Sequence, residues 1–173
     1  GADFSDALLN GADFSSTNCT EATFTGADVD GVTFGTDAEF GGIISGGIIG
    51  TPIDLPVSYF PHSIPPDDVH DGQWILEGGY FIGPHANLRD AWADEDFPPV
   101  DLTGVILYGA DLTGANLRAV NLTDANLFEA DLSGARLGYA NLTGAYLARV
   151  RSGGITTDED LDPDFGGPTL PNP

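Results

Sequence analysis

The apolar residues between Val100 and Arg149 recur at every fifth position. Leucine is the centre of ten consecutive five-residue units, at positions 102, 107, 112, 117, 122, 127, 132, 137, 142 and 147. Alanine or valine stands two residues before each leucine, aspartate or asparagine usually one before, and glycine often two after. A period of five matches neither the 3.6-residue period of a helix nor the two-residue period of a flat strand. We therefore interpret the segment as an internal repeat.

Residues 1–36 follow the same rule with more varied central residues, which are Phe4, Leu9, Phe14, Cys19, Phe24, Val29 and Phe34. One further unit, Ala86-Asn87-Leu88, restarts the pattern, and the register slips before Val100. Two blocks of five-residue repeats therefore flank a segment in which the repeat is interrupted.

This A(D/N)Lxx pattern resembles the pentapeptide-repeat family over about half of the chain. The resemblance implies an all-β fold, a right-handed quadrilateral β-helix in which four units form one square coil. It also implies that the central residue and the small residue two before it point inward. Coils would then stack at the strand spacing of about 4.8 Å. We expect this solenoid to be interrupted by a non-repeat insert rich in aromatic residues, proline and glycine.

The pattern divides the chain into a coil block at 1–36, an insert at 37–99, a second coil block at 100–150 and a tail at 151–173. The insert is too apolar for a flexible linker, so we expect it to pack on the coils or complete them. Short strands are predicted at 73–76 and 79–82, joined by a turn at Gly78-Gly79.

The tail repeats the opening of the insert. Ser45-Gly46-Gly47-Ile48 recurs in the tail as Ser152-Gly153-Gly154-Ile155. The larger unit is therefore a coil block followed by an insert, and the chain spans about one and a half such periods. Because position 1 opens inside a motif and methionine is absent, we expect a processed or partial product.

A coil of four units would place Phe4 beside Phe24 and Phe14 beside Phe34, and would leave one inner side to Cys19. A buried Cys19 is interpreted as a small apolar side chain rather than a reactive thiol. As the single cysteine, it also excludes an internal disulfide framework.

Some outward positions of the second block are unexpectedly apolar: Ile106, Tyr108, Phe128 and Tyr146. A contiguous apolar patch usually marks a contact surface, which either the chain's own insert or another subunit would cover. Arg118 and Arg136 fall on one side of adjacent coils. Arg149 and Arg151 end the block, where we expect them to meet a following acidic block.

The chain carries 27 acidic residues and five arginines, for a net charge of −22, and it has no lysine. Direct binding of nucleic acid needs a basic face, so it is excluded, as is attraction to anionic membranes. The sequence holds no apolar run of the roughly 20 residues that span a membrane, so membrane insertion is not expected.

Candidate chemistry is sparse, and no catalytic or cofactor-binding residues are predicted. His62, His70 and His85 lie near Asp67, Asp68 and Asp71, but their spacing matches no defined metal site. The alternating carboxylates Asp158, Asp160, Asp162 and Asp164 could take Ca²⁺ weakly, although the glycine and distal glutamate of an EF-hand loop are absent. The sequence therefore does not indicate an enzyme.

Two functions remain open. The leading hypothesis is a structural protein of an extracellular or cell-surface fibre, whose partners are copies of itself stacked head to tail. The family resemblance implies an alternative, because several pentapeptide-repeat proteins are acidic rods that resemble B-form DNA and bind DNA gyrase. The interruption at 37–99, and the Asn121 and Asn141 that replace aspartate in the column of Asp101, count against mimicry of DNA.

Overall fold

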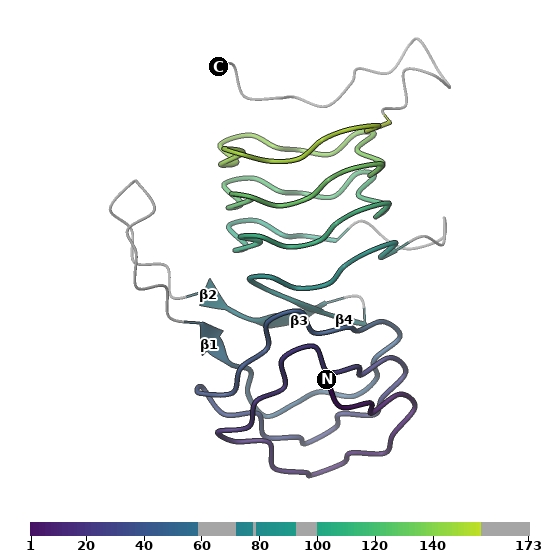
Figure 1. Ribbon diagram of the computed structural model, residues 1–173, viewed down its shortest axis with the longest axis vertical. Helices are drawn as coiled ribbons and strands as arrows, with labels where there is room; N and C mark the ends of the chain where they lie inside the picture. The colour runs from purple at the N-terminus through teal and green to yellow at the C-terminus, as the bar shows by residue number, and fades with distance from the viewer. Residues whose placement is uncertain (59–71, 78, 93–99, 157–173) are drawn as a thin grey trace. The chain divides into compact units, whose positions relative to one another are not determined.

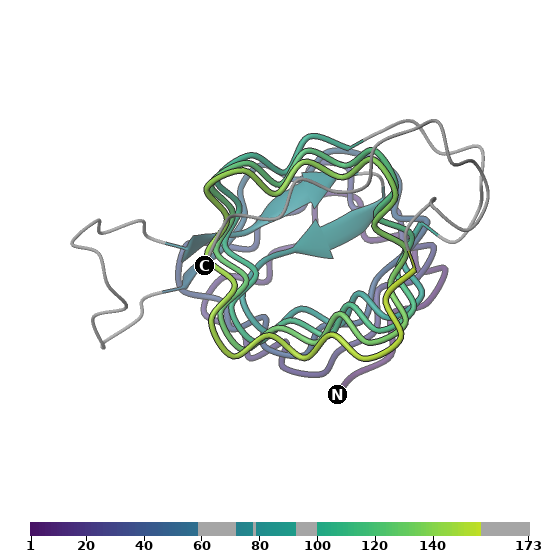
Figure 2. The ribbon, with the colours of Figure 1, turned by 90° about the horizontal axis from the view of Figure 1, so that it is seen from above.

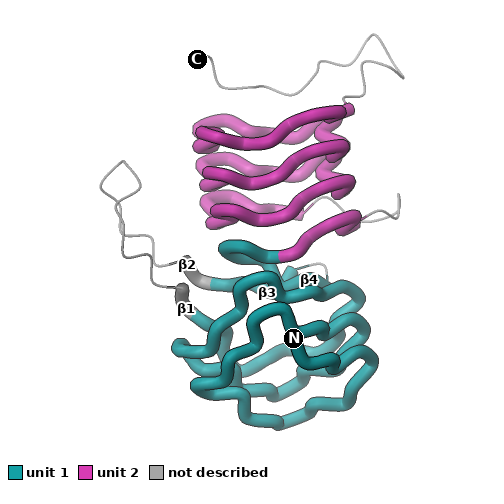
Figure 3. The backbone as a smooth tube through the Cα atoms, viewed as in Figure 1, with its two compact units in different colours: residues 1–86 teal, residues 87–173 magenta. Residues whose placement is uncertain are grey.

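The computed structural model describes residues 1–58, 72–77, 79–92 and 100–156 (Figure 1). The chain forms two compact units, Gly1–Ala86 and Asn87–Pro173 (Figure 3). Each unit holds a stack of coils with a four-sided outline (Figure 2). No helix long and apolar enough to cross a lipid bilayer occurs among these residues.

Each corner of a coil is a tight turn that the five-residue pattern encodes. In the first repeat of the pattern, the Ala7 amide donates to the Phe4 carbonyl at 3.1 Å, and Asp6 has a φ of 55°. Glycine adopts such left-handed conformations without steric cost, and aspartate and asparagine tolerate them better than most residues. This explains why glycine so often stands two residues after the central one.

The aspartate or asparagine before each central residue also has a local role. Its side-chain oxygen accepts a hydrogen bond from the backbone amide two residues later, as in Asp101 to Thr103 at 3.1 Å and Asn121 to Thr123 at 3.2 Å. Such bonds stabilise turns, and short polar side chains make them readily. The sequence preference at this position is therefore a requirement of the backbone.

In unit 2 each level repeats the one before it after four five-residue repeats, as the bridges Asp101–Asn121–Asn141 and Ile106–Asn126–Tyr146 show. The first level differs, because Asn87 pairs with Asp111 rather than with Leu107. The extra residues lie before Val100, where the sequence pattern slips. Leucine and alanine fill the interior, and Leu107, Leu117 and Leu127 are fully buried.

In unit 1 the coil continues past residue 36. Asp3 pairs with Thr23 at the regular spacing, whereas Asn18 pairs with Glu39 and Thr23 with Ile44, so the second spacing is longer by one residue. The added residue lies at a corner, where the Asp37 carboxylate accepts a hydrogen bond from the Ser16 hydroxyl at 2.6 Å. The first part of the insert, to Asp54, thus forms a third level of the stack.

This continuation alters one interior column. Cys19 was expected to have one inner side to itself, but the longer spacing places Phe40 above it. The other expected columns are present, with the rings of Phe4 and Phe24 4.9 Å apart and those of Phe14 and Phe34 5.5 Å apart.

The remaining described part of unit 1 forms two small antiparallel sheets. Strand β1 (Val57–Ser58) pairs with β2 (Gly72–Gln73), and β3 (Ile75–Glu77) pairs with β4 (Tyr80–Ile82). The predicted hairpin is therefore present, but its first strand begins at Ile75 rather than Gln73, because Gln73 pairs with Val57 instead. In Figure 2, the teal strands β3 and β4 lie across the purple and blue outline of the unit 1 coils.

The β3–β4 hairpin closes the third level of unit 1. The Phe81 ring lies within 5.7 Å of the Phe24 ring, 5.4 Å of Phe34 and 5.2 Å of Phe40. Phe81 and Trp74 are almost completely buried. The hairpin thus supplies the large apolar side chains that the third level lacks, since Ser45 and Gly50 occupy two of its central positions.

Candidate interaction surface

The structure places the four apolar outward residues on one side of unit 2, which we call the tyrosine face: Ile106, Tyr108, Phe128 and Tyr146. Tyr108 and Phe128 stack with ring centroids 5.6 Å apart, and Phe128 and Tyr146 with centroids 5.8 Å apart. The rings are nearly parallel, at 18° and 5°. Tyr146, on the last described level, remains 37% exposed. The face is therefore a three-ring stack that runs along the coil axis.

Charged groups border this stack. The Arg149 guanidinium lies 5.5 Å from the centre of the Phe128 ring and donates to the Glu129 carboxylate at 2.9 Å. The Tyr108 hydroxyl donates to the same carboxylate at 3.4 Å. Sequence reasoning missed Glu129 and Arg149 as members of this surface. The 20-residue period of the coil could have predicted this pair, because Arg149 follows Glu129 by one full coil and therefore lies above it on the next level.

The opposite side of unit 2 carries Arg118 and Arg136 on adjacent levels. Asn116 pairs with Arg136, and Arg118 belongs to the same five-residue repeat as Asn116. The Arg118 guanidinium lies 5.7 Å from the centre of the exposed Tyr139 ring, a cation–π arrangement. Tyr139 was also missed, because it stands at a corner position where glycine or a polar residue is usual.

The two arginines at the end of the block have partners within the chain. Arg151 lies 3.2 Å from the Asp131 carboxylate, and Arg149 pairs with Glu129. We expected both to face a following acidic block. In the structure each arginine follows its carboxylate partner by one full coil, so each ion pair joins two adjacent levels. Arg89 similarly pairs with Asp111 at 3.1 Å.

These contacts keep the column of Asp111 and Asp131 ionised. Burial acts to raise the pKa of Asp111, but hydrogen bonds from Thr113 and the Arg89 charge outweigh it, so the pKa is lowered. Hydrogen bonds from Ser133 lower the pKa of Asp131, and the Arg151 charge adds to this effect. The column therefore consists of ion pairs rather than bare carboxylates.

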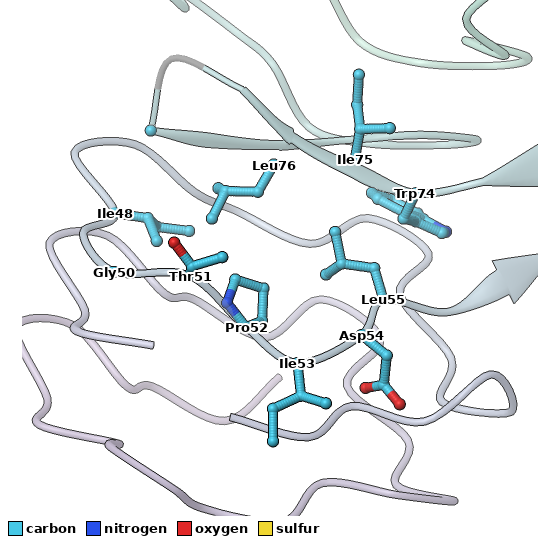
Figure 4. Close-up of a pocket in the computed structure, with 11 residues that line it drawn as sticks. Ile48, Gly50, Thr51, Pro52, Ile53, Asp54, Leu55, Trp74, Ile75 and Leu76 are labelled. Carbon is cyan, nitrogen blue, oxygen red and sulfur yellow. The ribbon is translucent and has the colours of Figure 1, made fainter. Parts of the chain in front are cut away.

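Unit 1 contains a cavity of about 470 Å³ between its third level and the hairpin (Figure 4). Apolar side chains dominate its lining, with Ile48, Pro52 and Leu55 on one side and Trp74 and Leu76 on the other. Among the described residues that line it, Asp54 alone is titratable. The Asp54 Oδ1 accepts hydrogen bonds from the Phe34 and Gly35 amides, both at 2.9 Å. The described residues that line this cavity do not include a paired acid and base.

The proposed metal ligands cannot be placed. Asp158, Asp160, Asp162 and Asp164 lie outside the described residues, as do His62, His70, Asp67, Asp68 and Asp71. Within the part of the chain that is described, no three His, Cys, Asp or Glu residues are grouped to hold a metal ion. Cys19 is buried, and burial raises the pKa of its thiol, which makes it less reactive.

The geometry defines unit 1 and unit 2 as stacks of a quadrilateral β-helix. The family model for pentapeptide repeats matches residues 1–35, 100–134 and 125–151, together about half of the chain. The chain therefore belongs to the pentapeptide-repeat family. No curated protein matches it.

Similar solved structures include other pentapeptide-repeat proteins. Rfr23 from the cyanobacterium Cyanothece 51142 is 23% identical over 82% of this chain, with a TM-score of 0.34, and this chain spans 60% of its length. HetL of Nostoc sp. strain PCC 7120, involved in heterocyst differentiation regulation, is 21% identical over 96% of this chain and 68% of its own, with a TM-score of 0.21. QnrB1, a plasmid-mediated fluoroquinolone resistance protein, is 14% identical over 92% of this chain and 93% of its own, with a TM-score of 0.36. These likenesses concern the fold alone.

Proposed function

We propose that this chain is a non-enzymatic structural protein whose coil stacks join end to end in a fibre. The proposal rests on an open strand edge along the first level of unit 1. The backbone N–H and C=O groups of Asp3, Leu8, Asp13 and Asn18 have no hydrogen-bond partner within the described part of the chain. Leu8 is also 82% exposed. An unpaired strand edge is a template for pairing with another segment.

The last described level of unit 2 has an edge with the complementary groups. Between levels one and two of unit 1, the Phe4 amide donates to the Thr23 carbonyl and the Thr23 amide donates to the Ala2 carbonyl, both at 2.8 Å. The Leu142 amide and Ala140 carbonyl occupy the positions of the Phe4 amide and Ala2 carbonyl. Within the described residues, both lack a partner. Such unlike edges favour head-to-tail contacts, which build open filaments rather than closed dimers.

Light scattering and negative-stain electron microscopy test the proposal. We expect particles whose mass rises with concentration, more strongly in millimolar calcium, because cations screen a net charge of −22. Leu8→Pro removes one edge amide and should abolish growth, whereas Leu8→Ala keeps the amide and should not. Monomers of the unmodified chain under all conditions would refute end-to-end assembly.

An extracellular or cell-surface location would suit this role, and millimolar calcium is available there. Immunogold labelling of intact cells tests it. Label confined to the interior of sectioned cells would exclude it.

A second candidate is an acidic rod that binds DNA gyrase. One observation favours unit 1 for this role: Gly1–Ala86 contains acidic residues but no arginine or lysine. Hydrogen bonds from Ser5 and Ser15 lower the pKa of Asp3 and Asp13, which therefore stay ionised. The ion pairs of Asp111 and Asp131 make unit 2 less suitable. Inhibition of gyrase supercoiling by the chain would support this candidate, and a lack of inhibition at micromolar concentrations would exclude it.

A further inference from the structure

We infer that the cavity of unit 1 binds an extended peptide of another protein, in which one basic residue stands between two apolar residues. Three features meet there: the apolar cavity itself, an open strand edge at residues 48–50, and carboxylates beside that edge. The inference goes beyond the proposed fibre and does not depend on it, because the site lies on the third level of unit 1 rather than on the first.

The cavity lies where one interior column lacks a side chain. Successive bridges place Leu9, Val29 and Gly50 at equivalent central positions on the three levels of unit 1. Val29 is fully buried, whereas Gly50 has no side chain and lines the cavity together with Trp74 and Leu76 (Figure 4). Apolar side chains of a bound peptide would therefore continue the column that Gly50 interrupts.

The backbone beside Gly50 presents one acceptor and one donor on its open side. The Ile49 amide donates to the Ala27 carbonyl at 3.0 Å, and the Ile49 carbonyl accepts from the Val29 amide at 2.9 Å. In a planar trans peptide unit the N–H and C=O groups point in opposite directions. The Ile48 carbonyl and the Gly50 amide therefore point away from the second level. Neither has a hydrogen-bond partner within the described residues.

The level below shows how such a pair of groups is used. There the Ala27 carbonyl and the Val29 amide together bind both backbone groups of Ile49. One residue of an extended peptide would in the same way donate to the Ile48 carbonyl and accept from the Gly50 amide. Its two neighbours would point inward to the cavity, because alternate side chains of an extended segment face opposite directions. The edge and the cavity thus fit a segment with apolar residues on both sides of the pairing residue.

Carboxylates lie beside this edge. A Cβ atom on Gly50 would lie 2.8 Å from the Asp28 Oδ1 atom. The Asp30 Oδ1 atom accepts a hydrogen bond from the Thr51 amide at 3.3 Å, and Asp54 lines the cavity. Unit 1 contains no arginine or lysine that would neutralise these charges. A basic group on the ligand is therefore a better electrostatic complement to the site than a neutral or acidic group.

The outward position of the peptide is the place for this basic group. Ile49 is 58% exposed, and the alkyl stem of a lysine beside it would cover this apolar surface. The charged head of the lysine would then face the side of unit 1 that carries Asp28, since Ile49 and Asp28 form a bridge. The preferred ligand therefore has the pattern apolar–basic–apolar.

The test is an NMR titration of the full chain, labelled with ¹⁵N, with the synthetic peptide acetyl-Gly-Leu-Lys-Leu-Gly-amide. We expect saturable shifts of the Gly50 amide and Trp74 indole signals, and none of the Leu127 amide signal in unit 2. Replacing both leucines of the peptide by serine keeps its charge and should weaken binding at least tenfold, because the apolar burial is lost. Methylation of the lysine amide nitrogen removes the donor to the Ile48 carbonyl and should weaken binding about fivefold.

A matched pair of variants tests the charge. Asp30→Asn removes one carboxylate beside the edge but keeps an oxygen for the Thr51 amide, and should weaken binding two- to fivefold. Glu21→Gln removes the same charge at a different corner of unit 1 and should leave binding unchanged. Equal weakening by both variants would overturn the inference, because it would indicate attraction to the net charge alone.

Two further results would also overturn the inference. The first is equal binding of the leucine and serine peptides, or no shift of the Gly50 amide signal with either. The second is protection of the Gly50 amide from hydrogen exchange in the free chain. Protection that is independent of chain concentration would mean that a segment of the chain itself pairs with the edge. Protection that rises with concentration would assign the edge to a second copy of the chain.

Discussion

The two units build the same coil with different interiors. The interior of unit 2 consists of leucine and alanine side chains. Its described levels from Val100 onward keep one constant spacing, so the interior side chains of each level pack on those of the next. Unit 1 uses phenylalanine, lengthens its spacing by one residue and places Ser45 at a central position of its third level. The regular interior of unit 2 can thus be extended by further repeats of the same kind. The third level of unit 1 lacks large central residues, and the Phe81 ring of the hairpin packs there against Phe34 and Phe40.

The paired glycines show the same contrast. Gly46 and Gly153 have equivalent backbone bonds, but only Gly46 lies against an aromatic ring, that of Tyr80. The repeated sequence therefore adopts two backbone conformations, because Gly46 has a φ of 158° outside any turn, whereas Gly153 and Gly154 form a turn.

The largest expected effect is on the closure of unit 1. Phe81→Ala removes a fully buried ring that contacts three phenylalanines, and should destabilise unit 1 by about 3–5 kcal/mol, the usual cost of such a cavity. Hydrogen exchange measures the effect at the Phe24 amide, with the Leu127 amide as the reference in unit 2. Equal loss of protection at both amides would show that the units do not unfold separately.

A smaller effect should separate a crowded glycine from an open one. Gly83→Ala would place a Cβ atom 2.4 Å from the Trp74 ring, so we expect a loss of about 1–3 kcal/mol from overpacking. Gly153→Ala is the matched control, because its Cβ atom meets nothing within 4 Å, and its effect should stay within about 0.5 kcal/mol. Chemical denaturation compares the variants, and equal midpoints would contradict the packing argument.

The tyrosine face should contribute less, because its rings are only partly buried. Phe128→Ala removes two ring stacks and the contact with Arg149, for an expected loss of about 1–2 kcal/mol from unit 2. Thermal unfolding with Tyr139→Ala as a comparison checks this value, since Tyr139 has a cation–π contact outside the stack. A loss as large as that of Phe81→Ala would mean that the face is part of the core.

The smallest effect is the dependence on pH. The pKa values of Asp111 and Asp131 are lowered in the folded chain, so their stabilisation is complete above the unfolded value near 3.8. It is lost as pH falls through the folded values. Asp131→Asn should therefore lower the melting temperature slightly at pH 6 and by less at pH 2. High salt should reduce the difference, and a larger effect at pH 2 would reverse the proposed sign.

Sequence reasoning reached the repeat, the inward and outward positions and the hairpin, because each depends on a local pattern. It ended the first coil at residue 36, since Ser45 and Gly50 do not have the large apolar centre that defines the repeat. The third level nevertheless forms, because backbone hydrogen bonds between coils do not depend on the central side chain. Arg149 and Arg151 were assigned to an external partner because their ion pairs span a whole coil.

The amino-acid sequence alone therefore determines the coil, because one small and one large apolar residue per side, with a turn in every repeat, leave the backbone few alternatives. Tertiary structure decides how the coil is completed. Whether a serine at a central position is buried depends on a hairpin that lies far along the chain, as the bond from Phe81 to Ser45 shows. The reason is physical: the turns are formed by neighbours in sequence, whereas the filling of the interior depends on residues that only folding brings together.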